Sequence, residues 1–144
     1  MATYKNYKSI GLIAVLFFCI TFSCTKNSEA IPYVAVSVQI NLSNPDYFAL
    51  KSPGGWVYIT GGSKGMVVYR LDNSTFKAYD RHCPYQPDNE CSRIAVENTQ
   101  LTVKDTCCSS VFQLMDGSII GGPADRNLQE YKTSFDGNIL SIYN

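Results

Sequence analysis

The chain has 144 residues, the length of one domain. Twelve basic and twelve acidic residues give a formal net charge of zero, and the absence of any basic run argues against nucleic acid as a partner. Apolar residues make up 45% of the chain, which excludes disorder throughout, and ten Tyr, seven Phe and one Trp suit a β-rich core.

The N-terminal segment predicts an export signal that is not part of the fold. Lys5 and Lys8 give it a basic start, and residues 10–22 form a run without any charge. That run is too short for a membrane-spanning helix, which needs roughly 20 apolar residues, but it is typical of a signal peptide. We therefore expect residues 1–23 to be a signal peptide of the lipoprotein type.

The segment Thr21-Phe22-Ser23-Cys24 closes this run. A small residue directly before a Cys resembles the lipobox of bacterial lipoproteins, whose Cys is freed by cleavage and acylated. The resemblance implies a lipidated Cys24, a polar tether over residues 24–30, and an exported domain anchored in the bacterial cell envelope on its periplasmic side. Without the signal the chain is mildly acidic, so attachment to the membrane would rest on the acyl chains. An ordinary secretory signal or a short anchor is the alternative.

Alternating apolar residues predict a half-buried strand over residues 34–42. Turn residues follow at 43–46, and residues 47–50 are a short strand candidate. Further strands are predicted over residues 56–60, 66–71, 75–79, 93–96, 100–103, 111–114, 118–120, 128–135 and 138–143. About ten short strands without a clear amphipathic helix indicate an antiparallel sandwich or a small barrel.

Three of the predicted loops contain distinctive residues. Residues 61–65, Gly-Gly-Ser-Lys-Gly, lie between two strands and are interpreted as a hairpin loop, since a phosphate-binding P-loop must open a helix. Residues 80–91 contain two Pro, two Cys and the chain's one His without any periodicity, which predicts an ordered loop. Residues 105–110 form a second Cys-bearing loop.

Cysteine use predicts disulfides in the exported domain. Cys19 leaves with the signal and Cys24 carries lipid, so four cysteines remain: Cys83, Cys91, Cys107 and Cys108. An even number in an oxidising compartment favours two disulfides. Spacing alone does not choose among the three pairings, although a bond between the adjacent Cys107 and Cys108 would strain the backbone.

The two Cys-bearing loops resemble those of the Rieske iron–sulfur family. Cys83-Pro84-Tyr85 is similar to the first Rieske loop, Cys-Pro-His. Residues 105–112, Asp-Thr-Cys-Cys-Ser-Ser-Val-Phe, are similar to the second, Cys-Pro-x-His-Gly-x-x-Phe. The resemblance extends over residues 31–144. It implies an all-β fold there, a Rieske-like antiparallel β-sandwich or small barrel with a small loop-bearing subdomain.

The ligand positions of that family are largely replaced here. A Rieske [2Fe–2S] centre needs two Cys thiolates on one iron and two His imidazoles on the other. The positions that match these ligands contain Cys83, Tyr85, Asp105 and Cys108. The chain has one His in total, so one subunit cannot supply two imidazoles. We therefore expect a degenerate site without a cluster or a metal; a [2Fe–2S] cluster is the alternative.

The resemblance also implies a disulfide pattern. In cytochrome bc-type Rieske proteins a disulfide joins the two cluster loops, and its positions match Cys91 and Cys107 here. Cys83 and Cys108 would then face each other across the cluster position and form a second bond. Two disulfides would in this way hold the loops in the place of iron and sulfide.

These observations predict a cluster-free, disulfide-linked envelope lipoprotein that binds an unknown envelope protein or serves a structural role. An electron-transfer protein with a non-standard [2Fe–2S] centre and a thiol–disulfide redox protein are alternatives. No hydrolase arrangement is visible, so no catalytic residue is assigned.

Four further interpretations concern metal sites and single residues of the two loops. A zinc site could draw on His82, Cys83, Cys107 and Cys108, and a four-Cys iron–sulfur site on the four cysteines of the domain. Taken alone, His82 is interpreted as a partly exposed loop histidine. Asp105 is interpreted as a loop residue that accepts backbone hydrogen bonds.

Overall fold

The computed structural model describes residues 30–144, which form ten β-strands and one short 3₁₀ helix. The predicted signal peptide, residues 1–23, and Cys24 lie outside the described residues. No helix within residues 30–144 is long and apolar enough to cross a bilayer. The strands are β1 (Ser37–Asn41), β2 (Trp56–Ile59), β3 (Met66–Arg70), β4 (Phe76–Asp80), β5 (Ile94–Val96), β6 (Thr102–Asp105), β7 (Val111–Gln113), β8 (Ile119–Gly121), β9 (Glu130–Phe135) and β10 (Ile139–Tyr143). The all-β prediction is therefore confirmed.

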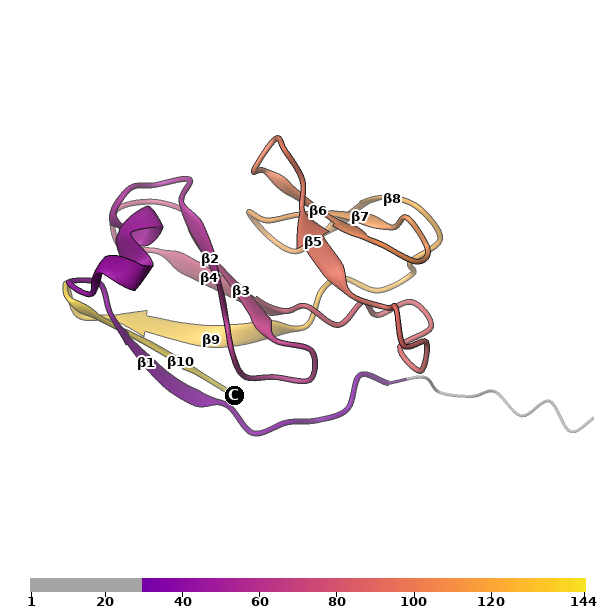
Figure 1. The fold of residues 1–144 in the computed structure, drawn as a ribbon, viewed down its shortest axis with the longest axis horizontal. Helices are drawn as coiled ribbons and strands as arrows, with labels where there is room; N and C mark the ends of the chain where they lie inside the picture. Colours follow the sequence, from indigo (N-terminus) through magenta and orange to yellow (C-terminus); the bar gives the residue numbers. More distant parts are fainter. Residues whose placement is uncertain (1–29) are drawn as a thin grey trace, which may run out of the picture.

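The strands form two antiparallel sheets. One has six strands in the order β1-β10-β9-β4-β3-β2, and the other has four strands in the order β5-β6-β7-β8. We call the six-stranded sheet the base and residues 81–129, which contain the four-stranded sheet, the tip. The chain leaves the base after β4, builds the tip, and returns in β9 to pair with β4. Figure 1 shows the curled base on the left and the tip on the right.

The central hairpin of the base is buried on both faces. Met66, Val68 and Ala78 belong to the base core. Val67, Tyr69 and Tyr79, which alternate with these residues along β3 and β4, belong to a second core. The tip contributes Ile94, Val103, Phe112 and Leu114 to the same core. Because apolar side chains point to both sides, β3 is a continuous apolar run rather than an alternating one. This second core fixes the tip against the base.

The predicted strand at residues 47–50 is wrong, because Pro45–Lys51 form the 3₁₀ helix η1. The Asn44 side chain accepts a hydrogen bond from the Asp46 amide at 3.0 Å and so caps the first turn. Pro45 suits the first helical position, because a backbone N–H at that position would have no partner within the helix. These local start signals outweigh the apolar character of residues 47–50.

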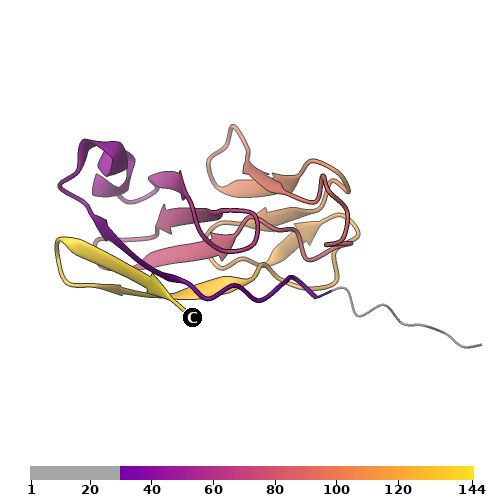
Figure 2. The ribbon, with the colours of Figure 1, turned by 60° about the horizontal axis from the view of Figure 1, so that its bottom comes forward.

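The segment before β1 leads toward the tip. The strand predicted from residue 34 begins at Ser37, because the Asn144 side chain bonds the Val36 amide at 3.0 Å and the Val34 carbonyl at 2.9 Å. The segment before Ser37 runs along the base beside the C-terminus, as Figure 2 shows. Ala30 and Ile31 line a small pocket together with Pro84 and Arg126 of the tip. The described chain therefore begins beside the tip.

Candidate functional site at the paired cysteine loops

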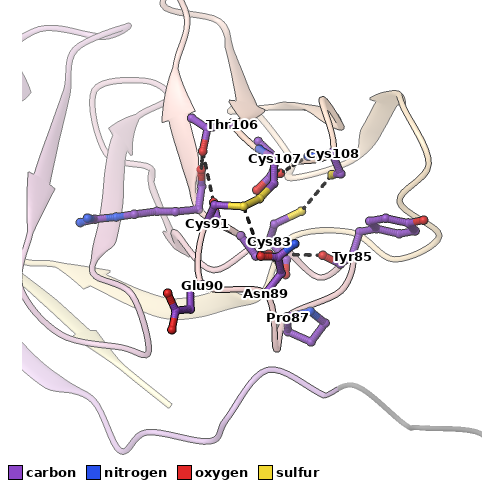
Figure 3. Close-up of a disulfide and its surroundings, with 12 residues drawn as sticks. Cys83, Tyr85, Pro87, Asn89, Glu90, Cys91, Thr106, Cys107 and Cys108 are labelled. Carbon is purple, nitrogen blue, oxygen red and sulfur yellow. Dashed lines mark hydrogen bonds between the residues drawn. A yellow bond between two sulfur atoms is a disulfide. The ribbon is translucent and has the colours of Figure 1, made fainter.

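Two loops of the tip meet at a cross-link. The first Cys loop, residues 81–93, follows β4, and the second Cys loop, residues 106–110, joins β6 to β7. Cys91 and Cys107 form a disulfide between them, with their Cα atoms 5.6 Å apart (Figure 3). Next to it, the Thr106 hydroxyl donates to the Cys91 carbonyl at 3.2 Å. The disulfide that the resemblance implied between the two loops is present.

Cys83 and Cys108 approach each other beside this disulfide (Figure 3). Their sulfur atoms lie 3.9 Å apart and both are thiols, so the predicted bond between them remains a proposal. Cys83 is fully buried, whereas Cys108 is half-buried. Burial raises the pKa of the Cys83 thiol to about 12, and a hydrogen bond from the Tyr85 backbone N–H acts in the opposite direction. The first Cys loop thus keeps a protonated thiol inside the domain.

Asp105 lies beside the two thiols at the end of β6, where it is 1% exposed. Its Oδ1 accepts the backbone N–H of Cys107 at 2.8 Å and that of Cys108 at 2.6 Å, which shapes the second Cys loop. Its Oδ2 is buried and has no hydrogen-bond partner within residues 30–144. One carboxylate oxygen of Asp105 and the sulfurs of Cys83 and Cys108 all lie within 4.8 Å of one another.

His82 is buried, at 4% exposed, and the interpretation as a partly exposed loop residue is wrong. Its Nε2 lies 2.7 Å from the Pro87 carbonyl and its Nδ1 lies 2.8 Å from the Ser63 hydroxyl. A carbonyl can only accept, so Nε2 carries the proton and Nδ1 accepts from Ser63. The loop turns inward here because both ring nitrogens find partners there. Neither nitrogen is free for a metal, and Cys107 is disulfide-bonded, so the structure does not assemble the zinc set drawn from His82, Cys83, Cys107 and Cys108.

The donor set does not fit a Rieske cluster. Tyr85 is half-buried and its ring points away from the two sulfurs (Figure 3). Of the four positions that match Rieske ligands, Cys83, Asp105 and Cys108 converge and Tyr85 does not. A Rieske [2Fe–2S] centre needs two imidazoles, and the ring nitrogens of His82 are both engaged. Cys91 and Cys107 are likewise committed to their disulfide, which removes them from a four-Cys site.

A buried carboxylate supports the first Cys loop, and sequence reasoning did not single it out. Asp80, at 0% exposed, accepts the amides of Ser63 at 2.6 Å and His82 at 2.8 Å, and the Tyr131 hydroxyl at 2.8 Å. The loop interpreted as a simple hairpin, residues 61–65, therefore binds the carboxylate with its backbone. The repeated Gly in that loop was the one sequence signal that its backbone lies close to another group, here the Asp80 carboxylate.

Lys64 connects the same glycine loop to the first Cys loop. Its ammonium group donates to the carbonyls of Asn89 at 2.9 Å, Glu90 at 3.3 Å and Ser92 at 3.0 Å. A flexible side chain with three donors suits three converging carbonyls. The base therefore holds the first Cys loop through Asp80 and Lys64 together.

Gly122 supports the second Cys loop, and Gly122→Ala is expected to lower the free energy of unfolding by about 2 kcal/mol. Its φ is +87°, and an added Cβ would meet the backbone of Ser110, including the amide nitrogen at 2.9 Å. Gly121→Ala is the matched control, since a Cβ there meets no atom within 4 Å. Urea unfolding of both variants checks this difference. Equal stability of the two would contradict close packing of Gly122 on the second Cys loop.

Comparison with known proteins supports the fold. No protein-family model matches the chain, and no curated protein is detectably similar to it. Among solved structures it is similar to the cyanobacterial plasma membrane Rieske protein PetC3 from Synechocystis PCC 6803, with a TM-score of 0.54 and 19% identity over 76% of this chain and 99% of that chain. It is also similar to the ferredoxin of carbazole 1,9a-dioxygenase from Nocardioides aromaticivorans IC177, with a TM-score of 0.48 and 15% identity over 77% of this chain and 98% of that chain.

At these identities the likeness concerns the fold. The likeness to PetC3 agrees with the arrangement of this domain as two antiparallel sheets. The chain therefore contains a Rieske-like domain.

Proposed function

We propose that this chain is a lipid-anchored protein of the bacterial cell envelope whose Rieske-like domain works without a [2Fe–2S] cluster, in a binding or structural role. One observation carries the proposal: the single His of the chain is buried with both ring nitrogens hydrogen-bonded, so the site offers no imidazole to iron. The Cys91–Cys107 disulfide joins the two loops without a metal. The signal-like N-terminus and Cys24 support the anchor.

A groove beside the tip supports the binding role. It has a volume of about 680 Å³ and is lined by residues 58–65 together with Arg81, Glu90 and Arg93. The Arg81 guanidinium lies 3.6 Å from the centre of the Tyr58 ring. Neither arginine forms an ion pair with another of the described residues. Two guanidinium groups in an open groove suit a partner with acidic groups.

The proposed anchor would keep the tip close to the membrane. The described chain begins beside the tip, at Ala30. Ala30 lies six positions after Cys24, and an extended chain spans at most about 20 Å over that separation. Acyl chains on Cys24 would therefore hold Ala30, and the side of the tip beside it, within about 20 Å of the lipid surface.

Iron analysis and lipid labelling test the proposal on full-length protein extracted anaerobically from its membranes. We expect a colourless protein without iron or acid-labile sulfide. We also expect incorporation of a tagged fatty acid that Cys24→Ser abolishes and Cys19→Ser, the matched control, retains. Iron and labile sulfide in equal amounts would contradict the cluster-free proposal and support the alternative, an electron-transfer protein with a non-standard ligand set. Unchanged labelling of Cys24→Ser would contradict the anchor.

The close sulfur pair supports a second candidate function, thiol–disulfide exchange. Cys83 and Cys108 are 3.9 Å apart as thiols, and the predicted second disulfide is their oxidised form. A structural disulfide has a reduction potential below about −300 mV, and an exchanging one lies well above it. The full burial of Cys83 argues against exchange with an external thiol, and redox titration of the pair tests this candidate function.

A further inference from the structure

Cys83, Asp105 and Cys108 form a group of metal-ligating atoms inside the tip. Cys83 and Asp105 are buried, Cys108 is half-buried, and one ligand atom of each lies within 4.8 Å of the others. A buried carboxylate oxygen without a partner costs free energy, and Oδ2 of Asp105 is such an atom within the described residues. No Lys or Arg of residues 30–144 forms an ion pair with Asp105. A cation beside the two sulfurs would remove this cost.

The separation of the sulfurs fits a shared metal ion. Two thiolates that bind one zinc ion at about 2.3 Å with tetrahedral geometry lie about 3.8 Å apart. The sulfurs of Cys83 and Cys108 lie 3.9 Å apart. A disulfide holds its sulfurs at about 2.0 Å, so a bond between Cys83 and Cys108 would require the two Cys loops to move closer to each other.

A backbone hydrogen bond orients the Cys108 sulfur. The Ser110 N–H donates to the Cys108 sulfur at 3.4 Å, from two positions further along the chain. Such outer hydrogen bonds orient thiolate ligands around a metal. Oδ1 of Asp105 is fixed by two amides of its own loop, which leaves Oδ2 for a ligand.

We propose that the reduced Cys83–Cys108 pair and Asp105 bind one divalent ion of the zinc class. Two sulfur donors select zinc over magnesium, calcium or manganese. On binding, the ion displaces the two thiol protons to solvent and forms two metal–sulfur bonds and one metal–oxygen bond. These residues supply three ligands, and water would supply the fourth. The inference rests on the proposed absence of a [2Fe–2S] cluster, which would require the same residues.

Cobalt(II), a coloured substitute for zinc, tests this site in full-length protein kept in detergent without oxygen. The Cys91–Cys107 disulfide is first verified by mass spectrometry. We expect one cobalt ion per chain, with sulfur-to-cobalt charge-transfer absorption and tetrahedral visible bands that added zinc removes. Asp105→Asn should weaken zinc binding at least tenfold, and Cys108→Ser should remove most of the charge-transfer absorption.

The matched control is Asp116→Asn, the same substitution at an exposed residue that also accepts a backbone hydrogen bond, from Ser118 at 2.9 Å. It should leave zinc affinity unchanged. A circular dichroism spectrum equal to that of the wild type shows that each variant is folded. Zinc binding by Asp105→Asn equal to wild type, or no cobalt–sulfur absorption, would overturn the inference. A zinc-free Cys83–Cys108 disulfide in protein from its own membrane would overturn it too and leave the proposed function intact, whereas iron with labile sulfide would contradict the proposed function itself.

Discussion

Asp80→Ala is expected to lower the free energy of unfolding by about 4 kcal/mol. The Asp80 carboxylate is fully buried and accepts the amides of Ser63, Lys64 and His82 and the hydroxyl of Tyr131. Alanine would leave these four donors without a partner, and each buried donor without a partner costs about 1–3 kcal/mol. Urea unfolding followed by circular dichroism measures the loss.

Tyr131→Phe is the control for this prediction, because it removes one donor and leaves the carboxylate in place. A hydrogen bond to a charged group contributes about 2 kcal/mol, so this variant should lose about half as much stability as Asp80→Ala. If both substitutions cost the same, the amide contacts from Ser63 and His82 would contribute nothing. The first Cys loop would then be held mainly by Lys64, the His82 ring and the disulfide.

Local patterns predicted most of the strands but not the helix η1. Period-two alternation identifies half-buried strands such as β1, since one face meets the core and the other meets water. The predicted ends are less accurate, because Asn144, more than 100 residues away in sequence, binds the backbone of Val34 and Val36. The helix η1 depends on Asn44 and Pro45, whose capping signal was overlooked beside an apolar segment that also suits a strand.

The candidate site was predicted through family resemblance rather than through pattern. The resemblance placed Cys91 opposite Cys107, because the order of the two loops along the chain is similar to that in Rieske proteins. The burial of His82 could not be predicted, since its partners Ser63 and Pro87 come from two different loops. The same holds for Asp105, whose buried Oδ2 follows from the tertiary packing of the tip.

Loss of the cross-link between the two Cys loops is expected to cost about 3 kcal/mol. The Cys91–Cys107 bond has a sequence separation of 16. Closure of a loop of this size lowers the entropy of the unfolded chain, which raises its free energy by that amount. The double variant Cys91→Ser/Cys107→Ser tests this without leaving an unpaired thiol. Urea unfolding under non-reducing conditions measures the change in the free energy of unfolding.

Cys108→Ser provides the comparison that decides what the second cysteine pair does. With Cys83 and Cys108 as thiols, metal-free protein should lose only about 1 kcal/mol, because a half-buried sulfur becomes a hydroxyl of similar size. If the two were instead joined by a disulfide, the same substitution would open a loop with a sequence separation of 25 and cost at least as much as removal of the Cys91–Cys107 bond. Equal losses in the two experiments would therefore contradict the thiol state of the pair. A small loss for Cys108→Ser beside a large loss for the double variant would show that a single disulfide holds the two loops together.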